Sequence, residues 1–171
     1  MNLKTYHLKN VNSTNDVAIR KIKSGIKYGI VISKNQKKGR GRYGNQWVSL
    51  KGNLFVSIFY KIKKINNLKY ITKQNCLLIK SILNKFTKEK IKIKLPNDLL
   101  IKNKKFCGIL QEIIKYKNNN FIIIGIGVNI HKSPNIDNYP TTNLSIYNEK
   151  VNKMTIFKNI KKCYESKILC I

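Results

Sequence analysis

Acidic residues are scarce in this chain, which has 7 Asp and Glu against 35 Lys and Arg and a formal net charge of +28 over 171 residues. A charge of this sign and size is typical of nucleic-acid-binding proteins. Arginine, the residue that most often reads base edges, is also rare, however, and is limited to Arg20, Arg40 and Arg42. The lysines extend from Lys4 to Lys167, and no recognition-helix, zinc-finger or basic-zipper pattern is present. We therefore expect no specific nucleic-acid partner, and we attribute the charge to a genome bias that enriches Lys, Ile and Asn together.

Long apolar runs are absent as well. The longest, such as residues 121–126, are far too short to span a bilayer, and residues 1–9 contain no apolar run of the secretory kind. The cysteines lack the paired spacing of a metal site, and no His/Cys cluster indicates a protein-bound transition metal. They are Cys76, Cys107, Cys163 and Cys170. We therefore expect a cytoplasmic protein with reduced thiols, no membrane partner and no metal ligands, and we expect Cys107 to be a small core residue.

Short apolar segments with the pattern of strands dominate what is present. Residues 91–95 alternate with period two, as a half-buried strand does. The predicted strands are residues 29–33, 54–60, 91–95, 99–101, 106–116 and 121–130. Short polar turns join several of them, as in antiparallel sheets. The chain therefore predicts one α+β domain, residues 1–171, with a mixed, largely antiparallel sheet covered by helices.

Three helices are predicted, at residues 17–24, 69–88 and 151–169. The first follows good N-cap residues at positions 12–15 and precedes Gly25, a typical C-cap. In the other two, apolar residues recur at helical spacing and would face the sheet. They are Ile71, Leu78, Ile82, Leu83 and Phe86 in one, and Ile156, Ile160, Tyr164 and Ile168 in the other.

The segment 35–49 is the most distinctive stretch, because it interleaves Gly39, Gly41 and Gly44 with Arg40 and Arg42. Arginine supplies a rigid fork of donors for carboxylate or phosphate, and glycine lets the backbone approach a ligand closely. The segment lies between two predicted strands and is expected to form a flexible cationic lid. Taken alone it is equally consistent with a solvated turn or an RNA-contacting Arg-Gly segment.

Two further glycines, Gly125 and Gly127, lie in the most apolar predicted strand. Glycine weakens a strand unless another group approaches its backbone closely. We therefore expect some part of the chain, or a ligand, to lie directly against this strand.

Several short motifs follow one another in a set order. They are Ser13-Thr14-Asn15, Gln36, Gly39-Arg40-Gly41-Arg42-Tyr43-Gly44 with Trp47, Lys94-Leu95-Pro96-Asn97-Asp98, Lys105 with Gly108-Ile109-Leu110 and Glu112, Gly125-Ile126-Gly127-Val128-Asn129, and Tyr139-Pro140-Thr141-Thr142-Asn143-Leu144. This series, spanning residues 13–144, resembles the catalytic domain of biotin protein ligases.

The resemblance implies the fold shared by biotin ligases, lipoate ligases and class II aminoacyl-tRNA synthetases. It also implies the reaction: biotin and ATP with Mg²⁺ give biotinyl-5′-AMP and pyrophosphate. The biotinyl group then passes to a lysine of a biotin carboxyl carrier domain, in acetyl-CoA carboxylase or a related biotin enzyme.

The resemblance also assigns site residues. Those implied to bind biotin are Ser13, Thr14, Asn15, Gln36, Arg40, Gly41, Arg42, Lys105, Gly108 and Leu110. Those implied to bind ATP are Arg42, Trp47, Asn97, Lys105 and Asn129, with Trp47 covering adenine. Arg40, Lys105 and Asp98 are the expected catalytic residues: the cations would offset two anions, and Asp98 would help the acceptor ammonium lose its proton. Glu112 is expected to have a structural role in its strand, with magnesium contact left open.

Two departures from the family pattern stand out. Leu95 occupies a position that is usually Trp, which removes an aromatic wall near biotin. The chain also shows no N-terminal helix-turn-helix and no C-terminal β-barrel domain, so we expect a minimal catalytic domain without a repressor role. The alternatives are a lipoate or octanoate ligase of the same fold, or an inactive relic that binds biotin or nucleic acid.

The charge leads to a first testable prediction. Because the lysines are dispersed, we expect only weak binding to DNA of arbitrary sequence, falling steeply between low and physiological salt. A salt titration by fluorescence anisotropy measures this. Tight binding that persists at high salt would show that nucleic acid is a specific partner.

Overall fold

Seven strands form a single sheet in the computed structural model, which describes residues 2–63, 67–137 and 139–169. Their spatial order is β1-β2-β3-β7-β6-β5-β4. The strands are β1 (Thr5–Val11), β2 (Tyr28–Gln36), β3 (Leu54–Ile62), β4 (Ile91–Lys94), β5 (Asp98–Ile101), β6 (Lys104–Tyr116) and β7 (Asn119–Val128). Only the β1–β2 pair is parallel, and the other neighbours are antiparallel. The prediction of a mixed, largely antiparallel sheet in an α+β fold is confirmed.

The first strand, β1, was absent from the sequence prediction. It lies at the edge of the sheet and pairs only with β2 among the described strands. His7 and Lys9 are exposed, while Tyr6 and Leu8 pack partly buried against the cluster under α1. An edge strand has one row of backbone groups unpaired and needs fewer apolar residues than a central strand. Its apolar pattern was therefore too short to detect.

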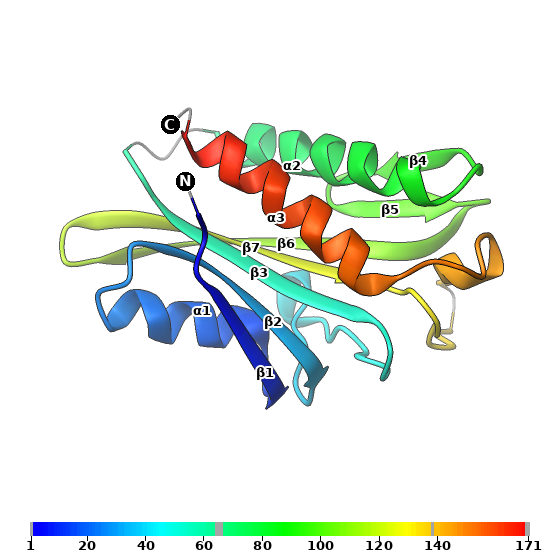
Figure 1. The fold of residues 1–171 in the computed structure, drawn as a ribbon, viewed down its shortest axis with the longest axis horizontal. Helices are drawn as coiled ribbons and strands as arrows, with labels where there is room; N and C mark the ends of the chain where they lie inside the picture. Colours follow the sequence, from blue (N-terminus) through cyan, green and yellow to red (C-terminus); the bar gives the residue numbers. More distant parts are fainter. Residues whose placement is uncertain (1, 64–66, 138, 170–171) are drawn as a thin grey trace.

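Helices cover both faces of the sheet (Figure 1). α1 (Thr14–Lys23) packs on one face, and α2 (Leu68–Leu83) lies beside α3 (Lys153–Leu169) on the other. Because successive side chains of a strand point to opposite faces, one strand serves both cores. In β3, Phe59 belongs to the α1 cluster, whereas Ile58 and Tyr60 belong to the cluster under α2 and α3.

The helix boundaries follow local capping. α1 begins earlier than predicted, at Thr14, because the Ser13 hydroxyl accepts a hydrogen bond from the Asn15 amide at 3.2 Å. α2 ends at Leu83 and continues as a 3₁₀ turn, Asn84–Phe86, so the predicted helix to residue 88 was too long. Thr87 is extended, which ends the helical path.

Two buried thiols lie in the core under α2 and α3. Cys107 is fully buried, as predicted, and burial raises the pKa of its thiol well above the usual value. Burial, with a smaller contribution from the Asp98 charge, raises the pKa of the Cys76 thiol to about 11. Both thiols are therefore protonated at neutral pH and act as small apolar groups. Cys170 lies outside the described residues.

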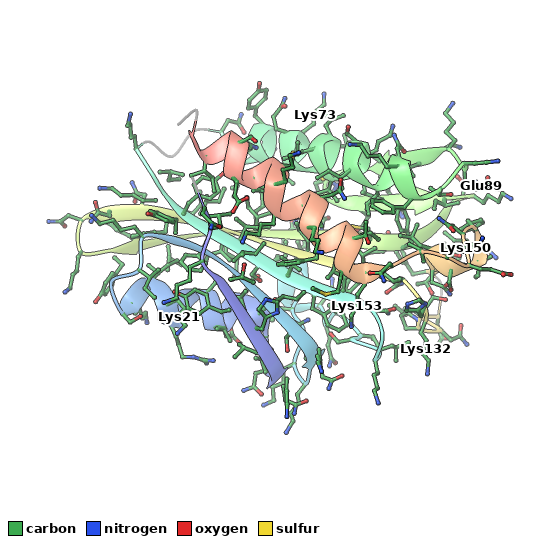
Figure 2. All side chains as sticks on the ribbon, in the orientation of Figure 1. Lys21, Lys73, Glu89, Lys132, Lys150 and Lys153 are labelled. Atoms are coloured by element: carbon green, nitrogen blue, oxygen red, sulfur yellow. The ribbon has the colours of Figure 1, made fainter. Side chains whose placement is uncertain are left out.

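The positive charge is spread over the surface. Figure 2 shows Lys21 by α1, Lys73 by α2, and Lys132, Lys150 and Lys153 toward the right-hand side of the molecule. In the three ranges that the structure describes, no helix combines the length and the apolar character that crossing a membrane requires.

The α2 packing gives a second prediction. Ile79 is completely buried between α2 and the sheet, so Ile79→Ala should lower the free energy of unfolding by about 2–5 kcal/mol. Leu77→Ala, on the same helix at 42% exposure, should change it by only about 0.5 kcal/mol or less. Chemical denaturation of both variants measures the difference. Equal losses would mean that α2 does not pack through the Ile79 face.

Candidate functional site

One cavity of about 230 Å³ opens on the α1 side of the sheet. Its floor is formed by β6 and β7, and the N-terminus of α1 forms one wall. The glycine loop, which we define as residues 37–49, forms the opposite wall and follows β2. Hydrogen bonds from Gly41 N to Asn45 O (2.7 Å) and from Trp47 N to Gly39 O (2.9 Å) fold this loop into a short hairpin. As predicted, it lies between two strands of one sheet, β2 and β3.

Three glycines leave part of the cavity floor without side chains. Gly108 and Gly127 are paired across β6 and β7 and lie under Trp47, whose ring is 2.7 and 2.5 Å from where a Cβ atom would stand on each. At Gly125 the corresponding Cβ would stand 2.5 Å from the Asn15 side-chain oxygen. Real Cβ atoms do not make such contacts, so glycine is required. The prediction that a group lies directly against this strand is confirmed.

A polar group lies at the α1 end of the cavity. The Gln36 side-chain oxygen accepts hydrogen bonds from Thr14 N (2.8 Å) and Thr14 Oγ1 (3.0 Å). The Ser57 hydroxyl, buried in β3, contacts both the Thr14 hydroxyl and the Asn15 side-chain oxygen. Ser13, Thr14 and Asn15 are at most 4% exposed. Their side chains are therefore fixed before any ligand arrives.

Arg40 lies between two carboxylates. Its Nη2 is 2.7 Å from Glu112 Oε2 and 3.2 Å from Asp16 Oδ1. Glu112 Oε2 also accepts a hydrogen bond from Asn15 Nδ2 at 2.6 Å. The Arg40 Nε atom, in contrast, is buried and has no partner in the part of the chain that the structure describes. The sequence predicted a structural role for Glu112 within its strand. In the structure its side chain also contacts the loop, through Arg40, and α1, through Asn15.

A second ion pair stands on the other side of the cavity. Lys105 Nζ is 2.9 Å from Asp98 Oδ1, and the Tyr139 hydroxyl donates to Asp98 Oδ2 at 2.6 Å. Burial and the hydrogen bond to Asp98 raise the pKa of the Tyr139 hydroxyl, so it stays protonated and remains a donor. The Lys105 ammonium also lies 5.3 Å from the centres of the Trp47 and Tyr139 rings, within cation–π range.

Arg42 differs from the other cations of the cavity. Its Nη2 donates to the Tyr43 hydroxyl at 2.8 Å, and its guanidinium lies 4.6 Å from the centre of the Tyr43 ring. Within the described ranges, it is the cavity-lining cation without a carboxylate partner. Tyr43 is 88% exposed and has a φ of 54°, so this contact rests on an exposed side chain in a left-handed turn. Arg42 is therefore the cation most available to an incoming anion.

Trp47 lines both the main cavity and a smaller pocket of about 50 Å³. Its Nε1 is buried and has no hydrogen-bond partner in the described ranges. Asn129 lines the smaller pocket and not the main cavity. Its side chain donates to Thr142 O (3.2 Å) and accepts from Asn53 Nδ2 (3.3 Å), whereas Asn97 donates to Ile109 O (3.1 Å).

The structure brings nearly all of the sequence-predicted site residues to one place. Those that line the main cavity are Ser13, Thr14, Asn15, Gln36, Arg40, Gly41, Arg42, Trp47, Asn97, Asp98, Lys105, Gly108 and Leu110. Asn129 lies next to it in the smaller pocket. Leu95, expected near biotin as a reduced apolar wall, is 66% exposed and is not among the lining residues. The individual roles stay predictions.

Sequence patterns missed several residues that complete the site. Asp16, Ser57 and Tyr139 were given no role, although each contacts a predicted site residue. Tyr139 belongs to a motif of the resemblance, and Glu112 follows Gly108 and Leu110 at period two, which places all three on one face of β6. Asp16 and Ser57 have no sequence signal, because only the fold brings them to the cavity.

No group of three or more His, Cys, Asp or Glu side chains in residues 2–63, 67–137 and 139–169 could hold a metal ion. Asp98, which lines the cavity, is already paired with Lys105, and Glu112 and Asp16 are both paired with Arg40. These residues do not fit a resident metal centre.

Residues 8–129 match the biotin/lipoate A/B protein ligase family. The chain is 30% identical over 126 residues to the bifunctional ligase/repressor BirA of Escherichia coli. The aligned region covers 70% of this chain and 38% of that protein. The chain therefore spans less than half the length of that relative. The biotin protein ligase of Aquifex aeolicus in complex with biotin and ATP superposes with a TM-score of 0.80 at 27% identity, over 95% of this chain and 69% of the other.

A lipoate-bound protein of Plasmodium falciparum is more distant, with a TM-score of 0.62 and 16% identity over 95% of this chain and 63% of that one, and shows a likeness of fold alone. The family match covers most of the chain, including the glycine loop and the glycines of the cavity floor. The chain therefore belongs to the biotin/lipoate A/B protein ligase family and has the catalytic-domain fold of biotin protein ligases.

Proposed function

We propose that this chain is an ATP-dependent biotin protein ligase. It activates biotin as biotinyl-5′-AMP and transfers the biotinyl group to one lysine of a biotin carboxyl carrier domain. One observation carries the proposal: a single cavity gathers Arg40, Arg42 and Lys105 and leaves two buried donors, Arg40 Nε and Trp47 Nε1, without partners in the described ranges. Buried donors of this kind call for acceptors, which a bound ligand supplies.

The chemistry requires this concentration of positive charge. When the biotin carboxylate attacks the α-phosphate of ATP, two anions must approach each other and negative charge spreads over the phosphate oxygens. Fixed cations in a partly water-excluded cavity reduce that repulsion and stabilise the developing charge. Arg42, which lacks a carboxylate partner among the described residues, and Lys105, which has one, are the groups that we assign to these oxygens. Arg40 contributes its charge from the loop.

The uncharged part of biotin fits the α1 end of the cavity. Thr14, Asn15 and Gln36 form a rigid set of donors and acceptors that suits the polar ureido ring. The acyl chain then runs along the backbone of Gly108 and Leu110 toward Lys105. Because these polar side chains are ordered without ligand, binding costs little conformational entropy.

The nucleotide lies on the Trp47 side in this proposal. Trp47 covers adenine, and Asn97 and Asn129 lie near the phosphates, where their amides are already fixed by hydrogen bonds. Because the residues of this cavity do not fit a metal centre of their own, magnesium enters with ATP, held by its phosphates.

Transfer to the carrier requires a neutral lysine amine. The amine attacks the acyl carbon of biotinyl-5′-AMP, the bond to the AMP phosphate oxygen breaks, and the ammonium proton must leave. Asp98 is held by Lys105 and Tyr139 at the edge of the same cavity, so its carboxylate can position the arriving ammonium and accept that proton.

Substrate choice provides the main experiment. With ATP, Mg²⁺ and a carrier domain, we expect pyrophosphate release and acyl transfer with biotin, and none with lipoate or octanoate. Trp47 is the single tryptophan of the chain, so its fluorescence should change on titration with biotin. The higher similarity to a biotin-bound than to a lipoate-bound structure favours this outcome. Turnover with lipoate or octanoate alone would support the rival ligase, and no binding or turnover of any acid would reject a ligase function.

The role of Asp98 can be separated from that of the cations. We expect Asp98→Asn to leave pyrophosphate release with biotin within about twofold of the unmodified protein and to slow transfer to the carrier about a hundredfold, because the amide cannot take the proton. Rapid-quench measurement of each half-reaction tests this. Asp137→Asn, at an exposed position in the loop after β7, is the matched control and should change neither rate. Equal losses in both half-reactions would make Asp98 a structural residue.

A further inference from the structure

We propose that Glu112 is a positioning residue that holds the glycine loop closed over the cavity. Its carboxylate oxygen Oε2 receives Arg40 Nη2 of the loop at 2.7 Å and Asn15 Nδ2 of α1 at 2.6 Å. Glu112 therefore joins three separate elements, the loop, α1 and β6, at one atom. The effect on catalysis rests on the proposed function, whereas the closure of the loop does not.

The face of β6 explains how Glu112 reaches the loop. Gln111, one residue earlier, points to the other face, where its side chain donates to Ile71 O (3.3 Å) and accepts from Thr72 Oγ1 (3.0 Å) of α2. Glu112 therefore points to the α1 face, in line with Gly108 and Leu110 of the cavity floor. A carboxylate at this register position is the group that can meet Arg40.

The other end of the loop is tied to the same part of α1. Ser49 Oγ donates to Trp47 O (3.2 Å) and accepts from Gln36 Nε2 (3.1 Å), and Gln36 in turn accepts from Thr14 N. Asn15, bound to Glu112 through its amide nitrogen, has its oxygen held by Ser57. The start of the loop is held as well, because Lys37 N and Lys38 N donate to Val11 O and Asn12 O, both at 2.9 Å. Release of the Glu112 contact therefore frees the part of the loop around Arg40 while both ends remain tied.

Charge assistance gives this contact its strength. The side chains of Arg40 and Glu112 are 37% and 26% exposed, so the pair is partly screened by solvent. Asp16, at 3.2 Å from the same Arg40 nitrogen, offers a second, longer partner. We therefore expect loss of the Glu112 charge to raise the open population of the loop roughly fivefold, instead of disordering it completely.

Limited trypsin digestion tests whether Glu112 holds the loop closed, and it needs no ligand. Arg42 provides a cleavage site within the loop, and Lys150 in the exposed segment before α3 serves as an internal reference (Figure 2). For Glu112→Gln we expect cleavage after Arg42 to accelerate roughly fivefold while cleavage after Lys150 is unchanged. Arg40→Gln also removes the contact with Asp16, so it should accelerate cleavage at least as much. The double variant should not exceed Arg40→Gln, because Glu112 acts on the loop through Arg40.

Glu89→Gln is the matched control. Glu89 forms an ion pair with Lys102 at 2.9 Å by the turn that leads into β4, so the same chemical change is made at a different ion pair (Figure 2). This variant should be cut after Arg42 at the unmodified rate. Unchanged cleavage after Arg42 in Glu112→Gln would overturn the proposal. So would equal acceleration after Arg42 and Lys150, since it would indicate loss of overall stability.

Enzyme assays then test whether loop closure by Glu112 affects catalysis. A loop that opens more often should release biotin faster, so Glu112→Gln should raise KM for biotin roughly fivefold with a smaller change in kcat, and Glu89→Gln should change neither. If the unmodified chain does not turn over biotin, the proposed function fails while the proteolysis result still decides the role of Glu112. An unchanged KM in an active enzyme with a loosened loop would reject the positioning role.

Discussion

The close approach of side chains to three backbone glycines is the constraint on which the site depends. Gly108, Gly125 and Gly127 leave the floor of β6 and β7 bare, and Trp47 and Asn15 occupy the space where their Cβ atoms would stand. The indole can pack against the sheet only because no side chain projects at Gly108 and Gly127. The position of Trp47 then fixes the glycine loop, and the position of Asn15 brings the N-terminus of α1 to the cavity.

Charge is arranged around this floor in a scaffold that is otherwise strongly basic. Most lysines lie dispersed at the surface, where water and salt screen them. At the cavity, Asp98 forms an ion pair with Lys105, and Glu112 forms one with Arg40. The chain has only 7 acidic residues, and two of them pair with cations at this site. They hold two cations in place, and Arg42, without a carboxylate partner in the described ranges, is the third cation that lines the cavity.

The larger apolar cluster and the cavity lie on opposite faces of the sheet. α2 and α3 cover one face of the sheet and bury its larger apolar cluster, whereas the opposite face carries α1, the glycine loop and the cavity. Strand alternation makes this division, since Gln111 bonds to α2 and Glu112 faces the loop. A ligand can therefore engage the loop without disturbing the main core.

Local patterns in the sequence determined the strands from β2 onward, the three helices and the motifs that indicate the family, because period, capping and glycine placement are encoded over short distances. They did not reveal β1, whose residues form a strand only because β2 offers an edge for pairing. Tertiary structure alone decided that Glu112 meets Arg40 across 72 positions in the chain, that Tyr139 meets Asp98, and that Ser57 meets Asn15. Such contacts depend on strand order and register, which no short stretch of sequence contains.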